Sequence, residues 1–193
     1  IGPSSSHTAG AVRLGLMAKN IYKNTPKSVT FCLYNSYAHT GKGHGTEKGL
    51  LAGVLGLSVD DRKIKDIFNS DLAKQVDYKF EYKDNFKYHP NAVDIIFDGD
   101  NKMFISGESV GAGEIEITKI NDFNVKLTGK YNTVLLVYKD KPGMISQVSS
   151  LLQYHNINIA SLNCDRSGKG QEASMIISVD GNIHSEIIDN IEE

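Results

Sequence analysis

The fold of the last third of the chain is decided by the stretch YNTVLLVYKDKPGMI, residues 131–145. Its run Thr133–Tyr138 is apolar and β-branched, which is typical of a strand. The turn signal Asp140-Lys141-Pro142-Gly143 follows at once, with a proline that suits the first turn of a helix. Apolar residues at helical spacing then predict an amphipathic helix from Met144 to Tyr154.

Beyond this helix the pattern returns to strands. Asn156–Ile159 enters a strand that runs toward Asn163, and Ser167–Gly170 turns the chain into a further strand, Ala173–Val179. Isoleucines at helical spacing predict another helix from His184 onward. The order is βαββα, and a ferredoxin-like βαββαβ unit needs one more strand. We therefore expect that strand to be missing from this chain, or its edge to be supplied by a partner.

In the first two thirds of the chain, the sequence pattern changes from mixed helix and strand to mainly strand. The expected elements are, in order, a helix over 9–23 after a Ser/Thr cluster, a strand over 29–34, a glycine-spaced loop over 40–48, a helix over 48–57, one or two short helices over 60–76, and strands within 78–125 with a hairpin turn at Asp98–Asn101. We predict an α+β fold, with an N-terminal α/β domain over 1–129 and a ferredoxin-like domain over 130–193.

Composition excludes several classes of function. The net charge of −2 gives no general attraction to nucleic acid or to an anionic membrane, and no apolar run approaches the roughly 20 residues of a membrane span. The two cysteines, Cys32 and Cys164, form no CxxC motif, which fits a reducing cytoplasm. We expect a cytoplasmic protein. Because the chain opens on Ile1 rather than Met, we also expect residues before it.

The first stretch that could carry chemistry is Ser4–Thr8, directly before the first expected helix. The amides at the start of a helix and the helix dipole favour an anion such as a carboxylate. His7 titrates near neutrality and can serve as a base. The alternative is that Ser5 and Ser6 only cap the helix and His7 is solvated.

Two further polar stretches stand out. Thr40–Glu47 has glycines that let backbone approach a ligand, around His44, although it is no P-loop. Its alternative reading is a tight turn before a helix, with Thr46 as the cap. His89 precedes Pro90 and Asn91, which is either part of a site or a turn entering a strand. His39, His155 and His184 lack such context, and we expect them to be surface or packing residues.

These motifs carry two resemblances, one for each end of the chain. The last third resembles an ACT domain, through Asp140–Ile145, Asn158-Ile159, Asp165-Arg166, Gly170 and Val179–Gly181. The first two thirds resemble the β chain of the iron–sulfur L-serine dehydratases, through Gly2–Gly10, Thr40–Glu47 and His89–Asn91. That family often has Asp where Glu47 stands. A related β domain occurs as a regulatory module in some D-3-phosphoglycerate dehydrogenases.

The second resemblance implies an L-serine ammonia-lyase subunit that converts L-serine to pyruvate and ammonia. It implies His7 as the catalytic base and a set of serine-binding residues: Ser4, Ser5, Ser6, Thr8, His44, Gly45, Thr46, His89 and Asn91. A 4Fe-4S cluster needs cysteine thiolates, and this chain has no suitable set. The family holds that cluster in a partner α subunit, and the substrate binds where the two chains meet.

The ACT resemblance implies dimerisation and an amino-acid effector near the first turn. The residues carried over are Asp140, Gly143 and Asn158, of which Asn158 would act across the dimer interface. Alternatively, the turn is only a good helix start. For the whole chain, the rival to catalysis is a non-catalytic serine-sensing module, as in the dehydrogenase fusions. A weaker rival is a free-standing ACT sensor with a structural N-terminal domain.

Overall fold

The computed structural model describes residues 5–184 and Ile187. By the contacts within it, the chain divides into two compact units, Ile1–Asn121 and Asp122–Glu193. The boundary predicted at 129/130 stays a prediction. The mixture of helices and strands confirms the predicted α+β class.

The described part of the first sheet has six strands in the order β2-β1-β3-β4-β5-β6. Their bounds are β1 Ser28–Tyr34, β2 Asp77–Lys83, β3 Ala92–Asp98, β4 Met103–Gly111, β5 Glu114–Ile120 and β6 Phe123–Leu127. β1 and β2 pair in parallel, whereas β1 with β3, β3 with β4, and β4 with β5 pair antiparallel. The predicted turn between β3 and β4 is confirmed.

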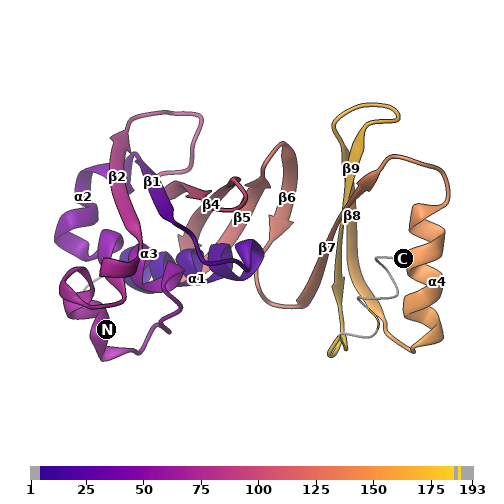
Figure 1. Ribbon diagram of the computed structural model, residues 1–193, viewed down its shortest axis with the longest axis horizontal. Helices are drawn as coiled ribbons and strands as arrows, with labels where there is room; N and C mark the ends of the chain where they lie inside the picture. The colour runs from indigo at the N-terminus through magenta and orange to yellow at the C-terminus, as the bar shows by residue number, and fades with distance from the viewer. Residues whose placement is uncertain (1–4, 185–186, 188–193) are drawn as a thin grey trace. The chain divides into compact units, whose positions relative to one another are not determined.

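Two helices cover one face of this sheet. A π-helical turn, η1 (Ser5–Gly10), runs directly into α1 (Ala11–Tyr22), and α3 (Thr46–Val54) packs against α1 (Figure 1). Phe31 and Leu33 of β1 are fully buried in this core, as is Leu14 of α1. Short 3-10 helices, η2 (Arg62–Asn69) and η3 (Ala73–Gln75), follow, as the sequence predicts for 60–76.

Glycines allow α1 and α3 to pack with their backbones in contact. A Cβ on Gly53 would lie 2.2 Å from the carbonyl oxygen of Val12, and one on Gly15 would lie 2.3 Å from that of Leu50. Both distances are far below van der Waals contact, so neither helix can carry a side chain there. The absence of a side chain at Gly53 therefore lets α3 pack closely on α1.

The prediction of a glycine-spaced loop over 40–48 is wrong. Residues Ser36–His44 form a helix, α2, and α3 starts at Thr46. The reversal takes place at Gly45 alone, which has the left-handed φ of 75° and donates its N–H to the carbonyl of Gly41. A Cβ on Gly41 would contact Leu33 and Thr46 at 3.4 Å. Tertiary packing therefore overrides the weak intrinsic helix propensity of these glycines.

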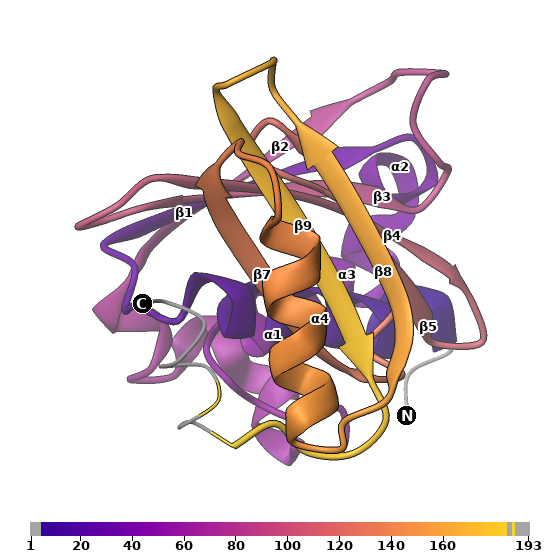
Figure 2. The ribbon, with the colours of Figure 1, turned by 90° about the vertical axis from the view of Figure 1, so that its right-hand side faces the viewer.

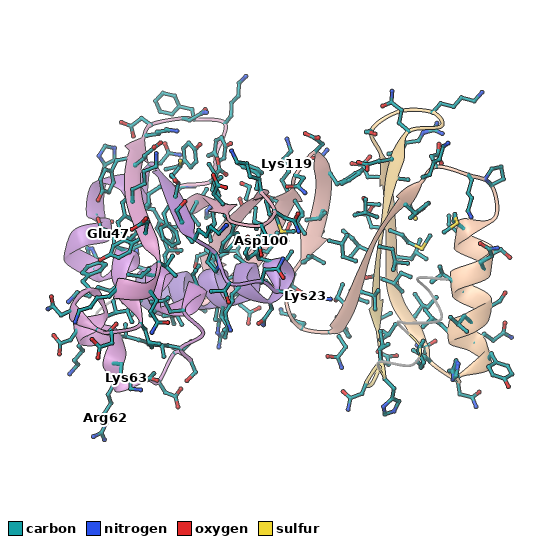
Figure 3. All side chains as sticks on the ribbon, in the orientation of Figure 1. Lys23, Glu47, Arg62, Lys63, Asp100 and Lys119 are labelled. Atoms are coloured by element: carbon teal, nitrogen blue, oxygen red, sulfur yellow. The ribbon has the colours of Figure 1, made fainter. Side chains whose placement is uncertain are left out.

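Glu47, which is labelled in Figure 3, lies in the first turn of α3. Its carboxylate accepts a hydrogen bond of 2.5 Å from the hydroxyl of Tyr82 on β2. A carboxylate in the first turn also interacts favourably with the helix dipole. This contact holds the α2–α3 junction next to the edge strand.

The other face of the sheet carries a buried carboxylate, Asp94, which is 4% exposed. Its Oδ2 accepts hydrogen bonds from the hydroxyls of Tyr34 at 2.8 Å and Tyr88 at 3.2 Å. The two tyrosine rings stack with their centroids 3.9 Å apart. Burial, followed by the bond to Asp94, raises the pKa of Tyr34 well above its usual value, so this hydroxyl stays a donor.

The second unit contains the elements predicted around the Asp140–Gly143 turn. They are β7 (Asn132–Lys139), α4 (Met144–Tyr154), β8 (Ile159–Arg166) and β9 (Glu172–Val179). The described strands form an antiparallel three-stranded sheet in the order β7-β9-β8, and α4 covers one face of it (Figure 2). The core between them is apolar, with Val148, Leu152, Met175, Ile177, Val179 and Ile187. The helix predicted from His184 onward lies largely outside the described residues.

No helix in the described part of the chain is both long enough and apolar enough to cross a membrane.

Candidate functional site

His7 is hydrogen-bonded to side chains of α2. Its Nε2 lies 2.9 Å from Thr40 Oγ1 and 3.5 Å from Ser36 Oγ. Thr40 Oγ1 also donates to the carbonyl oxygen of Ser36, at 2.7 Å. Residues 36 and 40 are one helical turn apart and so share the face of α2 that meets η1. The predicted base is therefore fixed by a helix that is adjacent in space and distant in sequence.

His44, the last residue of α2, brings a second imidazole to the same place. Its ring centroid lies 5.0 Å from that of His7, with the planes tilted by 39°. Its Nδ1 lies 3.0 Å from the carbonyl oxygen of Thr40. Thr8 Oγ1 donates to the carbonyl oxygen of His44 at 2.8 Å, which ties η1 to the Gly45 turn. The two sequence motifs that contain His7 and His44 thus form one site.

The environment of His7 favours its neutral form. Burial lowers the pKa of His7 below its usual 6.5, and the neighbouring His44 lowers it further. Two imidazoles at this separation cannot both be charged without repulsion. A neutral imidazole at neutral pH is the state in which a histidine can accept a proton.

Thr46, the first residue of α3, is fully buried, and its hydroxyl oxygen has no hydrogen-bond partner among the described residues. Buried polar atoms are almost always paired, so such an atom indicates a ligand or a water. Gly45, the residue before it, lies close to Thr8, since a Cβ on Gly45 would be 3.8 Å from Thr8 Oγ1. Thr46 thus directly follows the turn that lies close to Thr8, and its part in a site stays a prediction.

The backbone of Asn91 is connected to η1 through Ser109 on β4. The N–H of Ser109 donates a hydrogen bond of 3.0 Å to the carbonyl of Asn91. Ser109 also packs tightly on Gly10 of η1, since a Cβ on Gly10 would lie 2.3 Å from Ser109 Oγ. The side-chain oxygen of Asn91 is buried and has no partner in the described part of the chain. This is a second buried polar atom that needs a donor.

His89 has a local contact. Its Nδ1 accepts a hydrogen bond of 3.1 Å from the N–H of Asn91, which holds the turn before β3. That contact fits the reading of a turn that enters a strand. Among the remaining predicted residues, Ser4 lies outside the described residues, as do the side chains of Ser5 and Ser6.

Sequence reasoning missed the residues that support His7. Ser36 and Thr40 contact its ring, and Tyr37 lies fully buried with its ring centroid 5.3 Å away. Burial raises the pKa of Tyr37, which keeps its hydroxyl protonated. A signal was present: Ser36, Thr40 and His44 are spaced by four, so a helical reading of this segment would have placed them on one face.

The cysteines do not fit an iron–sulfur cluster site. Cys32 is 3% exposed in β1, and its thiol donates to Glu81 at 3.4 Å. Burial is the main cause that raises the pKa of the Cys32 thiol, so the protonated form is favoured. Cluster ligands, by contrast, are thiolates. Cys164 belongs to the other unit. Within the described residues, no three His, Cys, Asp or Glu side chains are grouped so that they could hold a metal ion.

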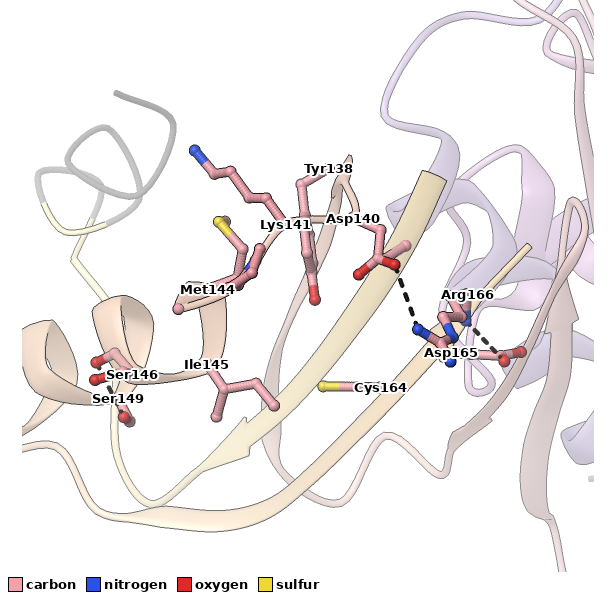
Figure 4. Close-up of a pocket in the computed structure, with 13 residues that line it drawn as sticks. Tyr138, Asp140, Lys141, Met144, Ile145, Ser146, Ser149, Cys164, Asp165 and Arg166 are labelled. Carbon is pink, nitrogen blue, oxygen red and sulfur yellow. Dashed lines mark hydrogen bonds and ion pairs between the residues drawn. The ribbon is translucent and has the colours of Figure 1, made fainter. Parts of the chain in front are cut away.

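The second unit has an open cavity of about 940 Å³ at the start of α4 (Figure 4). Polar and charged residues make up much of its lining: Tyr138, Asp140, Lys141, Ser146, Ser149, Asp165 and Arg166. Asp140 Oδ2 lies 3.5 Å from Arg166 Nη1 and accepts a hydrogen bond from the N–H of Gly170 at 3.2 Å. Gly143 has the left-handed φ of 92°, which favours glycine.

The third predicted effector residue lies elsewhere. Asn158 precedes β8 and donates to the carboxylate of Asp180 at 2.7 Å. Asp140 directly follows β7, whose last residue pairs with Glu172 at the start of β9. Asn158 directly precedes Ile159, which pairs with Val179 at the end of β9. Seven residues of strand separate these ends by about 23 Å. Within one copy of the described chain, Asn158 therefore does not share a cavity with Asp140 and Gly143.

Comparison with known proteins assigns a family to each end of the chain. Residues 1–74 match the family described as serine dehydratase beta chain, and residues 134–193 match the AHAS small subunit-like ACT domain. The chain is 38% identical to the probable L-serine dehydratase, beta chain, of Bacillus subtilis (strain 168), over 99% of this chain and 87% of that protein. It is 40% identical to the L-serine dehydratase, beta chain, of Peptoniphilus asaccharolyticus, over 93% and 82%.

A more distant similarity concerns the alternative role. The D-3-phosphoglycerate dehydrogenase of Bacillus subtilis (strain 168) is 27% identical over 73% of this chain, but the match covers only 27% of that protein. The dehydratase beta chains are more similar, and the matches cover 87% and 82% of them, so the regulatory alternative is not favoured. By the family model that matches its first part and by identity over most of its length, the chain belongs to the L-serine dehydratase beta-chain family.

Proposed function

We propose that this chain is the β subunit of an L-serine ammonia-lyase, in which His7 removes the α-proton of L-serine. The observation that carries the proposal is the pair of imidazoles, His7 in η1 and His44 at the end of α2, held together by Thr40. The reaction is the conversion of L-serine to pyruvate and ammonia. Family membership supports the class of reaction, and the geometry supports the roles of the residues.

The chain's own groups serve two parts of the reaction. The helix that begins at η1 favours a carboxylate at its N-terminus, through amides without intrahelical acceptors and through its dipole. Neutral His7 takes the Cα proton and the C3–O bond breaks; the released hydroxide and the proton taken up by His7 together make water, which restores neutral His7. The resulting aminoacrylate isomerises to an imine, which water hydrolyses to pyruvate and ammonia.

The buried orphan atoms support a bound polar substrate. Thr46 Oγ1 and Asn91 Oδ1 have no partner in the described residues, and a substrate amino or hydroxyl group would satisfy them. In this proposal both residues bind serine, together with Thr8 and the Gly45 turn. His89 acts by holding Asn91.

The leaving hydroxyl needs a Lewis acid, and this chain's residues do not fit the 4Fe-4S cluster of the family. A beta chain implies a partner subunit. We place the cluster in that partner, a cluster-bearing α subunit, so that the active site forms where the two chains meet.

The test is turnover of L-serine by this chain together with its partner, with pyruvate as the readout. We expect His7→Ala to lower kcat by about 10²- to 10⁴-fold, the usual contribution of general base catalysis, while serine still binds. The matched control is His39→Ala, because His39 is exposed and pairs only with Asp84 in the described structure. Full activity of His7→Ala would rule out its role as the base.

A second proposal concerns the cavity at the start of α4, which we assign to an amino-acid effector. The effector's carboxylate would meet the first amides of α4 next to Gly143, and its ammonium group would meet Asp140. Asn158 would act only from a second copy of the chain. Titration calorimetry with the common amino acids tests this, and the absence of binding by any of them would overturn it.

We also propose that the ACT domains pair. The side chains of edge strand β8 are mostly exposed, and an unpaired strand edge is a ready surface for association. Light scattering at micromolar concentration tests the proposal, and a strictly monomeric chain would contradict it.

A further inference from the structure

Thr40 contacts both imidazoles of the site, and it uses a different group for each. Its side-chain oxygen lies 2.9 Å from His7 Nε2, and its backbone carbonyl lies 3.0 Å from His44 Nδ1. The positions of the protons on these rings follow from what each group of Thr40 can donate and accept.

The hydroxyl of Thr40 has one proton and one strong acceptor for it. The carbonyl oxygen of Ser36 lies 2.7 Å away, the usual length of an O–H···O hydrogen bond, and a carbonyl only accepts. With its proton used there, Thr40 Oγ1 faces His7 Nε2 with a lone pair. A contact of 2.9 Å is then attractive only if Nε2 carries a proton and donates it.

For His44 the argument is simpler. The carbonyl of Thr40 has no proton to give, so a hydrogen bond of 3.0 Å to Nδ1 requires the proton to sit on Nδ1. In a neutral ring the lone pair then lies on Nε2. This Nδ1–H form is the minor tautomer of free histidine, so the structure departs here from what solution would favour.

We propose that Thr40 is a positioning residue that fixes opposite tautomers on the two histidines, Nε2–H on His7 and Nδ1–H on His44. In the neutral rings the lone pairs then lie on His7 Nδ1 and His44 Nε2. The catalytic consequence rests on the proposed function: if His7 is the base, it acts as the tautomer that Thr40 fixes, and the other tautomer is inactive.

The first test is nuclear magnetic resonance of the full chain labelled with ¹⁵N-histidine, in which protonated and unprotonated ring nitrogens resonate far apart. Near neutral pH the wild type should show His7 protonated on Nε2 and His44 protonated on Nδ1. This measurement needs no variant. Either ring in the opposite tautomer would overturn the proposal.

The second test removes the hydroxyl alone. In Thr40→Val, the Nε2–H of His7 faces a methyl group and keeps only the longer contact of 3.5 Å to Ser36 Oγ, so this tautomer loses its 2.9 Å acceptor. His7 should shift toward Nδ1–H, whereas His44 should keep its tautomer, because its acceptor is backbone. Thr40→Ser retains the hydroxyl and should match the wild type. An unchanged His7 spectrum in Thr40→Val would contradict the assignment.

Turnover with the partner subunit separates this inference from the proposed function. We expect Thr40→Val to lower kcat by about ten- to a hundredfold, the range for loss of a buried hydrogen bond, with KM within about twofold and recovery in Thr40→Ser. If the tautomer shifts while turnover is unchanged, the role of Thr40 stands and the role of His7 as base fails.

Discussion

Replacement of Gly53 by alanine should destabilise the first unit through the crossing of α1 and α3. The new Cβ would lie 2.2 Å from the carbonyl oxygen of Val12, 2.6 Å from the N of Leu16 and 2.9 Å from Cα of Gly15. All three atoms are backbone, so no side-chain rotation relieves the clash. The helices would have to separate by about 1 Å to restore van der Waals contact.

The magnitude follows from two opposing effects. Overpacking of a tight core costs about 1–3 kcal/mol, and the upper end applies because a whole helix must move. The higher helix propensity of alanine returns about 1 kcal/mol. The net loss is about 2 kcal/mol in the free energy of unfolding, which lowers the Tm of a unit of this size by roughly 6–10 °C.

The matched control is Gly43→Ala. Gly43 also lies in a helix, α2, but no heavy atom lies within 4 Å of the position of its Cβ. This substitution should leave stability unchanged or raise it by up to about 1 kcal/mol. Thermal and urea unfolding followed by far-ultraviolet circular dichroism measure both variants. Equal or greater stability of Gly53→Ala would refute the backbone-contact argument, and Gly15→Ala provides an independent repeat at the same crossing.

Two further predictions concern titratable groups. Burial lowers the pKa of His7, and the neighbouring His44 lowers it further. The contribution of His7 to the free energy of unfolding is therefore present above its unfolded pKa of 6.5, and it is lost as the pH falls through its folded pKa. His44→Gln should therefore raise the pKa of His7 in an NMR titration, and an unchanged or lower pKa would contradict this. Tyr34→Phe should cost about 1–3 kcal/mol in urea unfolding, because buried Asp94 loses its 2.8 Å donor. The control is Tyr154→Phe, because the Tyr154 side chain is 82% exposed, and it should leave the free energy of unfolding unchanged. An equal loss of stability in both variants would contradict the role of the buried hydrogen bond.

Most of the strands and helices could be predicted because their signals are local. Alternating and continuous apolar runs located β1, β3, β5, β7 and β9, and the Asp140–Gly143 turn located the start of α4. The segment 36–48 failed for a tertiary reason: its glycines predict a loop, whereas packing against Leu33 and Thr46 holds it as helix up to Gly45.

For the candidate site too, some features follow from local sequence and others only from tertiary structure. The sequence by itself determined the residue types, the two motifs around His7 and His44, and the family they resemble. Only the tertiary structure placed the rings 5.0 Å apart, assigned Ser36, Thr40 and Tyr37 to their support, and separated Asn158 from Asp140. The physical reason is that a histidine's pKa and tautomer depend on neighbours from other elements, which sequence spacing does not encode.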